Sequence, residues 1–343
     1  MAVAAVAATV VLPAGVASAD PAGPTDYEAR VVGVAPTDPA AAVPSGVGLT
    51  VEGHDSFLWL RLLPGMTAEV PGYDGEPYLR IDADGSVHRN RLSWSTWYNE
   101  DRFGDVERPD FVDPAASPDW ELIDDDSSVA WHDHRIHLMD PVPPIGAEPG
   151  DVVLTSVVPV TVDGVDLEVR VETTLVAGPS ARPMLGGLMI GVAVVAAFVV
   201  FGGRRIGAVT VMASTAGLVA LVVGGVQYLS QPIDTGPDRL WVAVPLAGLL
   251  AGLIGVVLER SGRWFWATGS AVVTGAMVGW WFLGRWSVFT SALIPTALPG
   301  SVDRLSTAAV GVVAAAVVIG SIGVLVRPGP VPGSADERSE PVA

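Results

Sequence analysis

The sequence contains no cysteine and no lysine in 343 residues, and aromatic residues make up only 7% of it. Without cysteine the chain can form no disulfide, no thiolate metal site and no cysteine nucleophile. Because every basic residue is arginine, we read the missing lysine as an effect of high genomic GC content. Half of the residues are nevertheless hydrophobic, a high share for a soluble protein with so few aromatic rings. The hydrophobic residues must therefore be concentrated in one part of the chain.

Charge divides the chain into two unlike halves. Residues 20–183 hold 30 Asp and Glu against 10 Arg, a net charge of −20, whereas residues 184–343 hold 7 against 9, a net charge of +2. A net charge of −20 argues against nucleic acid or an anionic lipid surface as a partner of the first half, because phosphate recognition needs clustered basic side chains. The acidic half is expected to lie in water.

The first 19 residues are typical of a secretory signal peptide. An apolar run ends in Ala17-Ser18-Ala19, which has the small residues of a cleavage site. The run lacks the usual positive charge at its start, so an upstream start codon or an atypical signal is also consistent with it. An uncleaved anchor helix is the alternative, although the run is short for a membrane span.

Five apolar segments of bilayer-spanning length predict a transmembrane domain over residues 184–327. They cover residues 184–202, 206–228, 240–258, 264–283 and 305–326. An external N-terminal domain and a cytoplasmic C-terminus agree with the positive-inside rule. The arginines expected in the cytoplasm are Arg204, Arg205, Arg260, Arg263, Arg327 and Arg338, and those expected outside are Arg239, Arg285 and Arg304. Residues 328–343 are rich in Pro, Gly and Ser and predict a disordered cytoplasmic tail.

The spans contain packing and interface signals but few ionisable residues. Six tryptophans near span ends predict an interfacial belt: Trp241, Trp264, Trp266, Trp280, Trp281 and Trp286. Glycine pairs four residues apart indicate close helix packing: Gly187/Gly191, Gly248/Gly252 and Gly275/Gly279. Ionisable side chains are expected only at span ends, which argues against an ion pump. Residues 286–300 are too short to span and are expected to lie along the outer surface or dip into the membrane.

Residues 20–178 predict an acidic all-β domain of the β-sandwich type, joined by a tether at 179–183 to an α-helical bundle of about five helices. The clearest hairpin covers residues 152–176, where apolar and charged residues alternate on either side of Asp163-Gly164. A second hairpin is expected around Asp84-Gly85. Residues 99–127 hold several prolines and aspartates and predict a long acidic loop.

Three of the five histidines fall between Trp131 and Met139. On a strand, His132 and His134 would project from one face about 7 Å apart, a spacing that two ligands of one metal ion can bridge. His137 would point to the other face unless the strand ends at Arg135 and turns. The sequence thus predicts a metal site at His132, His134 and His137, with four further candidate ligands. These are Asp133, Met139, His54 and His88.

The identity of the metal and the role of the cluster stay open at this point. Imidazole with a thioether suits copper, and imidazole with carboxylate suits zinc or copper(II). The first alternative to metal binding is a purely structural role, in which half-buried histidines are hydrogen-bonded to the backbone. The second alternative is a pH-sensing cluster. If a metal binds, its affinity should fall below about pH 6 as the imidazoles protonate.

Evidence for an enzyme is poor. Aromatic residues beside carboxylates, from Tyr73 to Arg80 and from Trp94 to Arg102, could line a sugar or small-ligand groove, but such residues more often form core and turns. The chain has no G-x-S-x-G elbow, no phosphate-binding glycine loop and no H-E-x-x-H motif.

Three stretches, Gly72–Arg80, Asn90–Arg102 and Trp131–His137, together resemble an uncharacterised family of exported actinobacterial membrane proteins. The resemblance covers mainly residues 27–178 and implies an extracytoplasmic β-rich domain followed by transmembrane helices, without an established activity. The architecture is also similar to copper-handling proteins that join an external β-sandwich to membrane helices, such as the copper resistance C and D pair. This chain has no set of His or Met ligands within its spans, which argues against passage of copper through them.

The sequence therefore predicts a non-enzymatic, multi-pass protein of the bacterial cell membrane whose external domain binds a ligand or partner, with copper or zinc as the candidate metal. Its expected partners are the lipid bilayer and an envelope protein, and not nucleic acid. Two alternatives remain: an envelope interaction or assembly factor with a structural histidine cluster, and a membrane transporter with an external accessory domain.

Overall fold

The computed structural model describes residues 21–140, 142–201, 206–232 and 235–326. The signal peptide expected at 1–19, the tail expected at 328–343 and four of the arginines used for orientation lie outside these residues. Those arginines are Arg204, Arg205, Arg327 and Arg338. The chain divides into a β-rich unit up to Ala177, with Gln231–Pro237, and a helical unit of Gly178–Ser230 and the chain from Asp238 onward.

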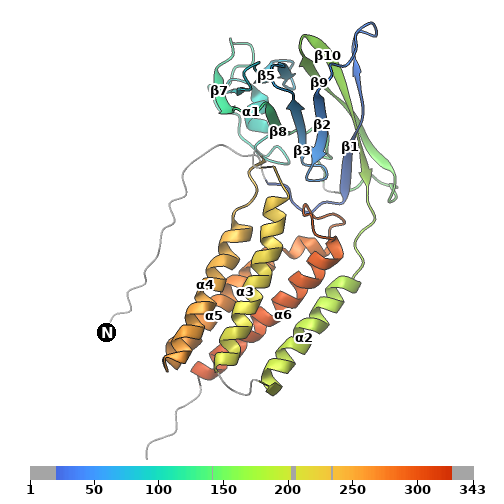
Figure 1. The fold of residues 1–343 in the computed structure, drawn as a ribbon. Helices are drawn as coiled ribbons and strands as arrows, with labels where there is room; N and C mark the ends of the chain where they lie inside the picture. The colour runs from blue at the N-terminus through green and yellow to red at the C-terminus, as the bar shows by residue number, and fades with distance from the viewer. Residues whose placement is uncertain (1–20, 141, 202–205, 233–234, 327–343) are drawn as a thin grey trace, which may run out of the picture. The chain divides into compact units, whose positions relative to one another are not determined.

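The described part of the β-rich unit forms two antiparallel sheets (Figure 1). The larger sheet has the order β1 (Tyr27–Pro36), β10 (Val165–Leu175), β9 (Val152–Val162), β4 (Ala68–Pro71), β5 (Pro77–Ile81), β6 (Val87–Asn90) and β7 (Trp120–Asp124). The smaller sheet has the order β2 (Val47–Glu52), β3 (Phe57–Leu62) and β8 (Ser128–His132).

The two sheets share one hydrophobic core. Leu60 of β3 and Trp131 of β8 belong to the same buried cluster as Leu79 of β5, Val160 of β9 and Val169 of β10. Two antiparallel sheets packed face to face over a common core form a sandwich. The expected β-rich, sandwich-type architecture is confirmed.

Both hairpins that Asp-Gly pairs predicted are present. Val162 of β9 faces Val165 of β10 across Asp163-Gly164, and both turn residues have positive φ angles, 47° and 77°. A type I′ turn needs two such residues, and its twist matches that of the flanking strands. Around Asp84-Gly85, Ile81 of β5 faces Val87 of β6. Short-range turn chemistry was therefore sufficient to place four of the strands.

The prediction of a long acidic loop at residues 99–127 is wrong in part, because strand β7 lies within this segment and pairs with β6. The side chain of Arg89 on β6 bonds Glu121 at 3.0 Å, and the Arg80 guanidinium lies 4.6 Å from the ring centroid of Trp120. A short helix, α1 (Trp94–Tyr98), also interrupts the β-rich unit. Neither element is long enough to show a clear period in the sequence.

The described residues of the helical unit form five long helices that correspond to the five predicted segments (Figure 1). They are α2 (Arg182–Phe201), α3 (Ile206–Leu229), α4 (Leu240–Arg260), α5 (Trp264–Gly284) and α6 (Gly300–Leu325). In the described part of the chain, α2, α3, α4 and α6 are long and apolar enough to cross a membrane, which confirms the helical structure, length and apolar character expected for four of the five segments. Helix α5 is as long but rich in Gly, Thr and Trp, and its crossing stays a prediction. Helix α2 begins at Arg182, inside the segment expected as a tether.

Glycines let these helices pack closely, as their spacing predicted. A Cβ atom on Gly187 of α2 would lie 2.2 Å from the carbonyl oxygen of Leu305 on α6, and one on Gly252 of α4 would lie 2.6 Å from Ser214 Oγ on α3. Gly279 is different, because a Cβ there would meet no described atom within 4 Å. Most, but not all, of the predicted glycine contacts therefore serve packing.

The helical unit contains a buried ion pair between two residues that lie just beyond the predicted bounds of two spans. Helix α6 begins at Gly300, five residues earlier than expected, and this brings Asp303 into its first turn. Arg285, directly after α5, donates from Nη2 to both Asp303 oxygens at 2.7 Å and from Nη1 to Gln227 Oε1. The two charged side chains are 1% and 0% exposed. Both charged residues lie at helix ends, where ionisable side chains were expected, but the sequence did not predict that they would be buried as a pair.

Arg304 is held inside the helical unit, and Trp281 is placed differently from its prediction. Arg304 is buried and donates to the carbonyl oxygens of Val288, Ser291 and Ala292, which fastens the segment after α5, including the short helix η2 (Trp286–Phe289), to α6. Trp281 is fully buried, and its Nε1 donates to the carbonyl oxygen of Trp241. It belongs to the core of the bundle and not to an interfacial belt.

Candidate metal centre

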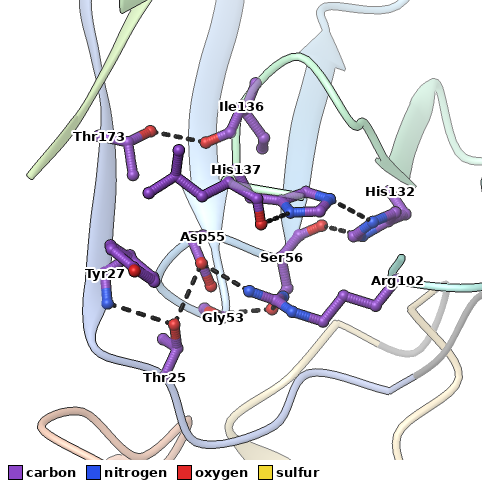
Figure 2. Close-up of polar contacts among 11 residues, drawn as sticks. Thr25, Tyr27, Gly53, Asp55, Ser56, Arg102, His132, Ile136, His137 and Thr173 are labelled. Atoms are coloured by element: carbon purple, nitrogen blue, oxygen red, sulfur yellow. Dashed lines mark hydrogen bonds and ion pairs between the residues drawn. The ribbon is translucent and has the colours of Figure 1, made fainter. Parts of the chain in front are cut away.

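The candidate site is built on the turn that follows β8. The strand ends at His132, and Asp133 then fixes the turn, because its Oδ1 accepts from the backbone N of Arg135 at 3.0 Å and its carbonyl accepts from the N of Ile136 at 3.0 Å. Ile136 is fully buried, and its carbonyl accepts from Thr173 Oγ1 of β10 at 2.7 Å (Figure 2). The expectation that His132 and His134 share one strand face is therefore wrong, and a turn brings His137 back toward His132.

The turn gathers the three predicted histidines into one cluster. A ring nitrogen from each of His132, His134 and His137 lies within 4.8 Å of those of the other two. The ring centroids are 5.0 Å apart for His132 and His134, 4.7 Å for His132 and His137, and 5.2 Å for His134 and His137. The residues are 2%, 9% and 1% exposed, in sequence order.

Backbone carbonyls define which nitrogen of each ring carries a proton. His132 Nδ1 lies 2.7 Å from the carbonyl oxygen of Ser56, and His137 Nδ1 lies 3.0 Å from that of Leu138. His134 Nε2 lies 3.0 Å from the carbonyl oxygen of Asp101. A carbonyl oxygen only accepts hydrogen bonds, so each of these nitrogens must be the N–H donor of its ring.

The opposite nitrogen of each neutral ring is consequently bare, and two of the bare nitrogens face each other. His132 Nε2 and His137 Nε2 are 2.9 Å apart (Figure 2). Two lone pairs at that distance repel unless a proton or a metal ion lies between them. His134 Nδ1 is buried without a hydrogen-bond partner among the described residues. The three bare nitrogens are thus available as ligands of a cation.

Burial disfavours a proton as that cation. Desolvation lowers the pKa of His132 well below its ordinary value, and the neighbouring His137 and His134 lower it further. Desolvation also lowers the pKa of His134, and it lowers the pKa of His137 to about 4, with a further contribution from Arg102. All three rings are therefore neutral at pH 7, the form in which imidazole binds metal ions.

The metal-free protein should lose stability as the pH falls from about 6.5 toward 4. The unfolded chain takes up protons below the ordinary histidine pKa of about 6.5, whereas His137 stays neutral in the folded state until about pH 4. Each such histidine should remove up to about 1.4 kcal/mol of stability per pH unit in this window. Unfolding followed between pH 7.5 and 4.5 checks this, with a shallower slope expected for His137→Gln. An identical slope in the variant would contradict the assignment.

A network of side chains around the β2–β3 turn positions His132 indirectly. Ser56, whose carbonyl accepts from His132, also accepts at Oγ from Arg102 Nη1 at 3.1 Å. Arg102 Nη2 bonds Asp55 Oδ2 at 2.6 Å, and Thr25 Oγ1 donates to the same oxygen at 3.1 Å (Figure 2). Burial raises the pKa of Asp55, while the Arg102 guanidinium acts in the opposite direction. This network fixes the carbonyl that orients His132.

The aromatic residues considered for a ligand groove pack around the cluster instead. Tyr73 accepts at its hydroxyl from the backbone N of His134 at 2.9 Å, and the Tyr98 ring lies 4.2 Å from the His134 ring. Glu76 is buried and accepts from Ser93, Ser95 and the backbone N of Asp74. This part of the predicted ligand groove therefore serves as core and turn.

The four further candidate ligands lie outside the group of three. Both oxygens of Asp133 are engaged, since Oδ2 accepts from Arg135 Nη2 at 2.7 Å and Trp131 Nε1 at 2.9 Å. Met139 is 36% exposed, His88 on β6 pairs with Asp82 at 3.3 Å, and His54 adopts a positive φ of 71° in the β2–β3 turn. Within the described residues, the metal-compatible group contains only His132, His134 and His137.

No family model, no curated protein and no solved structure matches this chain.

Sequence reasoning found the three histidines but missed the groups that orient them. Their partners are the backbone carbonyls of Ser56, Asp101 and Leu138. Every residue has such a carbonyl, so the residue type does not show which of them accepts a hydrogen bond. Asp55 and Arg102 were missed because 47 residues separate them in the chain. Only the pairing of β3 with β8 brings the Asp55-Ser56 turn to His132.

Proposed function

We propose that this protein holds a zinc or copper ion in its β-rich unit, bound by Nε2 of His132, Nε2 of His137 and Nδ1 of His134. One observation carries the proposal: a ring nitrogen from each of the three histidines lies within 4.8 Å of those of the other two, while a backbone carbonyl holds one N–H of each ring. Metal-binding histidines characteristically donate their second nitrogen in this way, which fixes both tautomer and ring orientation.

The distances suit one ion after a small adjustment. With bonds of about 2.0–2.1 Å to zinc, two ligand nitrogens lie at most about 4.2 Å apart, and the nitrogens here lie within 4.8 Å. His132 and His137, 2.9 Å apart, must separate slightly to reach tetrahedral spacing, while His134 moves closer. Imidazole ligands suit zinc and copper, and an ion between His132 and His137 would replace their repulsion with two bonds.

The helical unit supports a cellular location for the proposed metal site. Four apolar helices are compatible with anchoring in a membrane, and the net charge of −20 on residues 20–183 favours water around the β-rich unit. The distribution of arginines between the ends of the predicted spans agrees with placing that unit outside the cell. If α5 also crosses, the odd number of spans puts the C-terminus in the cytoplasm. Capture of a metal ion at the cell surface is therefore the activity that we propose, with no catalytic step.

Metal titration of the full-length protein in detergent tests this proposal. We expect one zinc or copper ion per chain by elemental analysis, and an increase in unfolding free energy of about 2.7 kcal/mol when the free ion reaches 100 times its dissociation constant. The double variant His132→Ala with His137→Ala should bind less than a tenth as much ion at the same free concentration. His88→Ala is the matched control, because His88 lies on β6 outside the cluster.

The same experiment separates the proposal from its alternatives. Absence of stoichiometric binding, or binding that survives in a folded double variant, would reject the metal site. The cluster would then be structural, as expected for an envelope assembly factor. Transport across the membrane is a separate hypothesis, which ion flux in reconstituted vesicles addresses.

A further inference from the structure

We infer that the three-histidine site takes a monovalent copper ion, Cu(I), in preference to a divalent ion such as Zn(II). This inference rests on the proposed function and adds the charge of the ion to it. Three features of the structure carry it: the ligands are uncharged, their side chains are almost fully buried, and the buried carboxylates next to them are already paired with arginines.

The ligands contribute no negative charge. Each histidine keeps one N–H because a backbone carbonyl accepts from it, so each ring binds as a neutral imidazole. The sequence has no cysteine, and the metal-compatible group among the described residues includes no carboxylate. A bound ion therefore keeps its whole formal charge, which is +1 for Cu(I) and +2 for Zn(II).

Burial makes that charge costly. His132 and His137 are only 2% and 1% exposed, and His134 is 9% exposed. In the Born description the cost of moving an ion from water into a protein grows with the square of its charge, so a divalent ion costs roughly four times as much as a monovalent ion of the same size. A buried site with neutral ligands consequently favours the lower charge.

The buried carboxylates next to the site cannot provide the missing countercharge. Asp133 forms an ion pair with Arg135 at 2.7 Å, and Asp55 forms one with Arg102 at 2.6 Å. Both carboxylates are fully buried in these pairs. Asp101 offers its backbone carbonyl to His134, while its side chain accepts from the backbone N of Phe103 and Asp105. The two buried carboxylates are therefore already neutralised by arginines, whereas Asp101, which is not buried, keeps its charge near the cluster.

The surroundings also fit an ion that needs only three ligands. Zinc held by three protein ligands usually completes a tetrahedron with water. Around this cluster the structure instead places rings: the Phe57 ring lies edge-on to His132 at 6.0 Å, and the Tyr98 ring lies 4.2 Å from His134. Cu(I) is stable with three imidazoles in a plane. Cu(I) prefers sulfur where it is available, but no thiol of this chain competes with the histidines.

Competition titrations of the full-length protein in detergent test the preference. Cu(I) would be supplied without oxygen and measured against a chromogenic Cu(I) chelator, Zn(II) against a zinc chelator, and Ag(I) would serve as a monovalent probe that does not change oxidation state. We expect Cu(I) to bind at least 100-fold more tightly than Zn(II), and Ag(I) to bind one ion per chain. X-ray absorption of the copper form should show three nitrogen neighbours.

A charge variant supplies an independent readout. Arg102 acts electrostatically on His132 and His137, so Arg102→Gln removes a positive charge whose repulsion of a divalent ion is twice that of a monovalent ion. The Zn(II) affinity should therefore rise relative to the Cu(I) affinity by about tenfold. Arg89→Gln is the matched control, because Arg89 pairs with Glu121 at the β6–β7 edge.

The outcomes distinguish this inference from the proposed function. Zinc binding that equals or exceeds Cu(I) binding would overturn the preference for a monovalent ion and leave the metal site intact. An unchanged affinity ratio in a folded Arg102→Gln variant would also count against the charge argument. Failure of all three ions to bind would overturn the metal site itself.

Discussion

Replacing Asp303 with alanine is expected to lower the unfolding free energy of the helical unit by about 3–5 kcal/mol. The change leaves Arg285 charged and buried, because its guanidinium donates to both Asp303 oxygens and its side chain is 1% exposed. Thr307 Oγ1 would also lose its contact with Asp303. Thermal or denaturant unfolding of the protein in detergent measures the effect.

Two further variants make this prediction specific. Asp238→Ala removes a carboxylate that accepts from the backbone N of Leu240 at the start of α4, and it should cost about 1 kcal/mol, as loss of a helix cap does. The double variant Arg285→Met with Asp303→Leu should regain most of the lost stability, because it leaves no unpaired charge. A similar loss in Asp303→Ala and Asp238→Ala would show that the buried pair contributes little.

The sequence predicted the secondary-structure elements that are determined by residues close together in the chain. Asp163-Gly164 and Asp84-Gly85 placed two hairpins because a tight turn depends mainly on its own residues: the first is a type I′ turn, and the second needs the positive φ of Gly85. Long apolar runs placed the five helices for the same reason. The edge strand β7 was missed, since only its ladder with β6 holds it extended.

The helical ion pair shows a different limit. Pro299-Gly300 marks the start of α6, and a proline just before a helix is a recognised start signal. Reading the helix from that proline would have placed Asp303 inside it. Nothing in the sequence, however, indicates that Arg285 and Gln227 meet this residue, because the three come from different parts of the chain.

The histidine cluster was predicted in part: its residues were identified, but the geometry that joins them was not. Its residues were predicted from their close spacing in the sequence, but the turn that joins them depends on Thr173 of β10 and on the burial of Ile136. Pattern analysis assigned His132 and His134 to one strand face because an alternating sequence is the simplest reading of the segment. Tertiary contacts ended the strand at His132.

Replacing Asp133 with alanine is expected to destabilise the β-rich unit by about 3 kcal/mol, near the lower end for a broken buried pair because Arg135 is partly exposed. Asp133 is fully buried and accepts from the backbone N, Nε and Nη2 of Arg135 and from Trp131 Nε1. The same change should weaken metal binding by about 10–100-fold, the usual effect of losing a group that orients ligands. Asp133 touches no proposed ligand nitrogen, so this loss would act through the turn that carries His134 and His137.

A matched carboxylate separates the effect of the turn from that of a lost charge. Asp82 pairs with Arg80 at 3.0 Å, but its side chain is 38% exposed, so Asp82→Ala should cost less than about 1 kcal/mol and leave metal affinity unchanged. Unfolding and metal titration of both variants give the comparison. If Asp133→Ala kept native metal affinity, the three histidines would not depend on the turn for their positions, and the ligand geometry derived from it would be wrong.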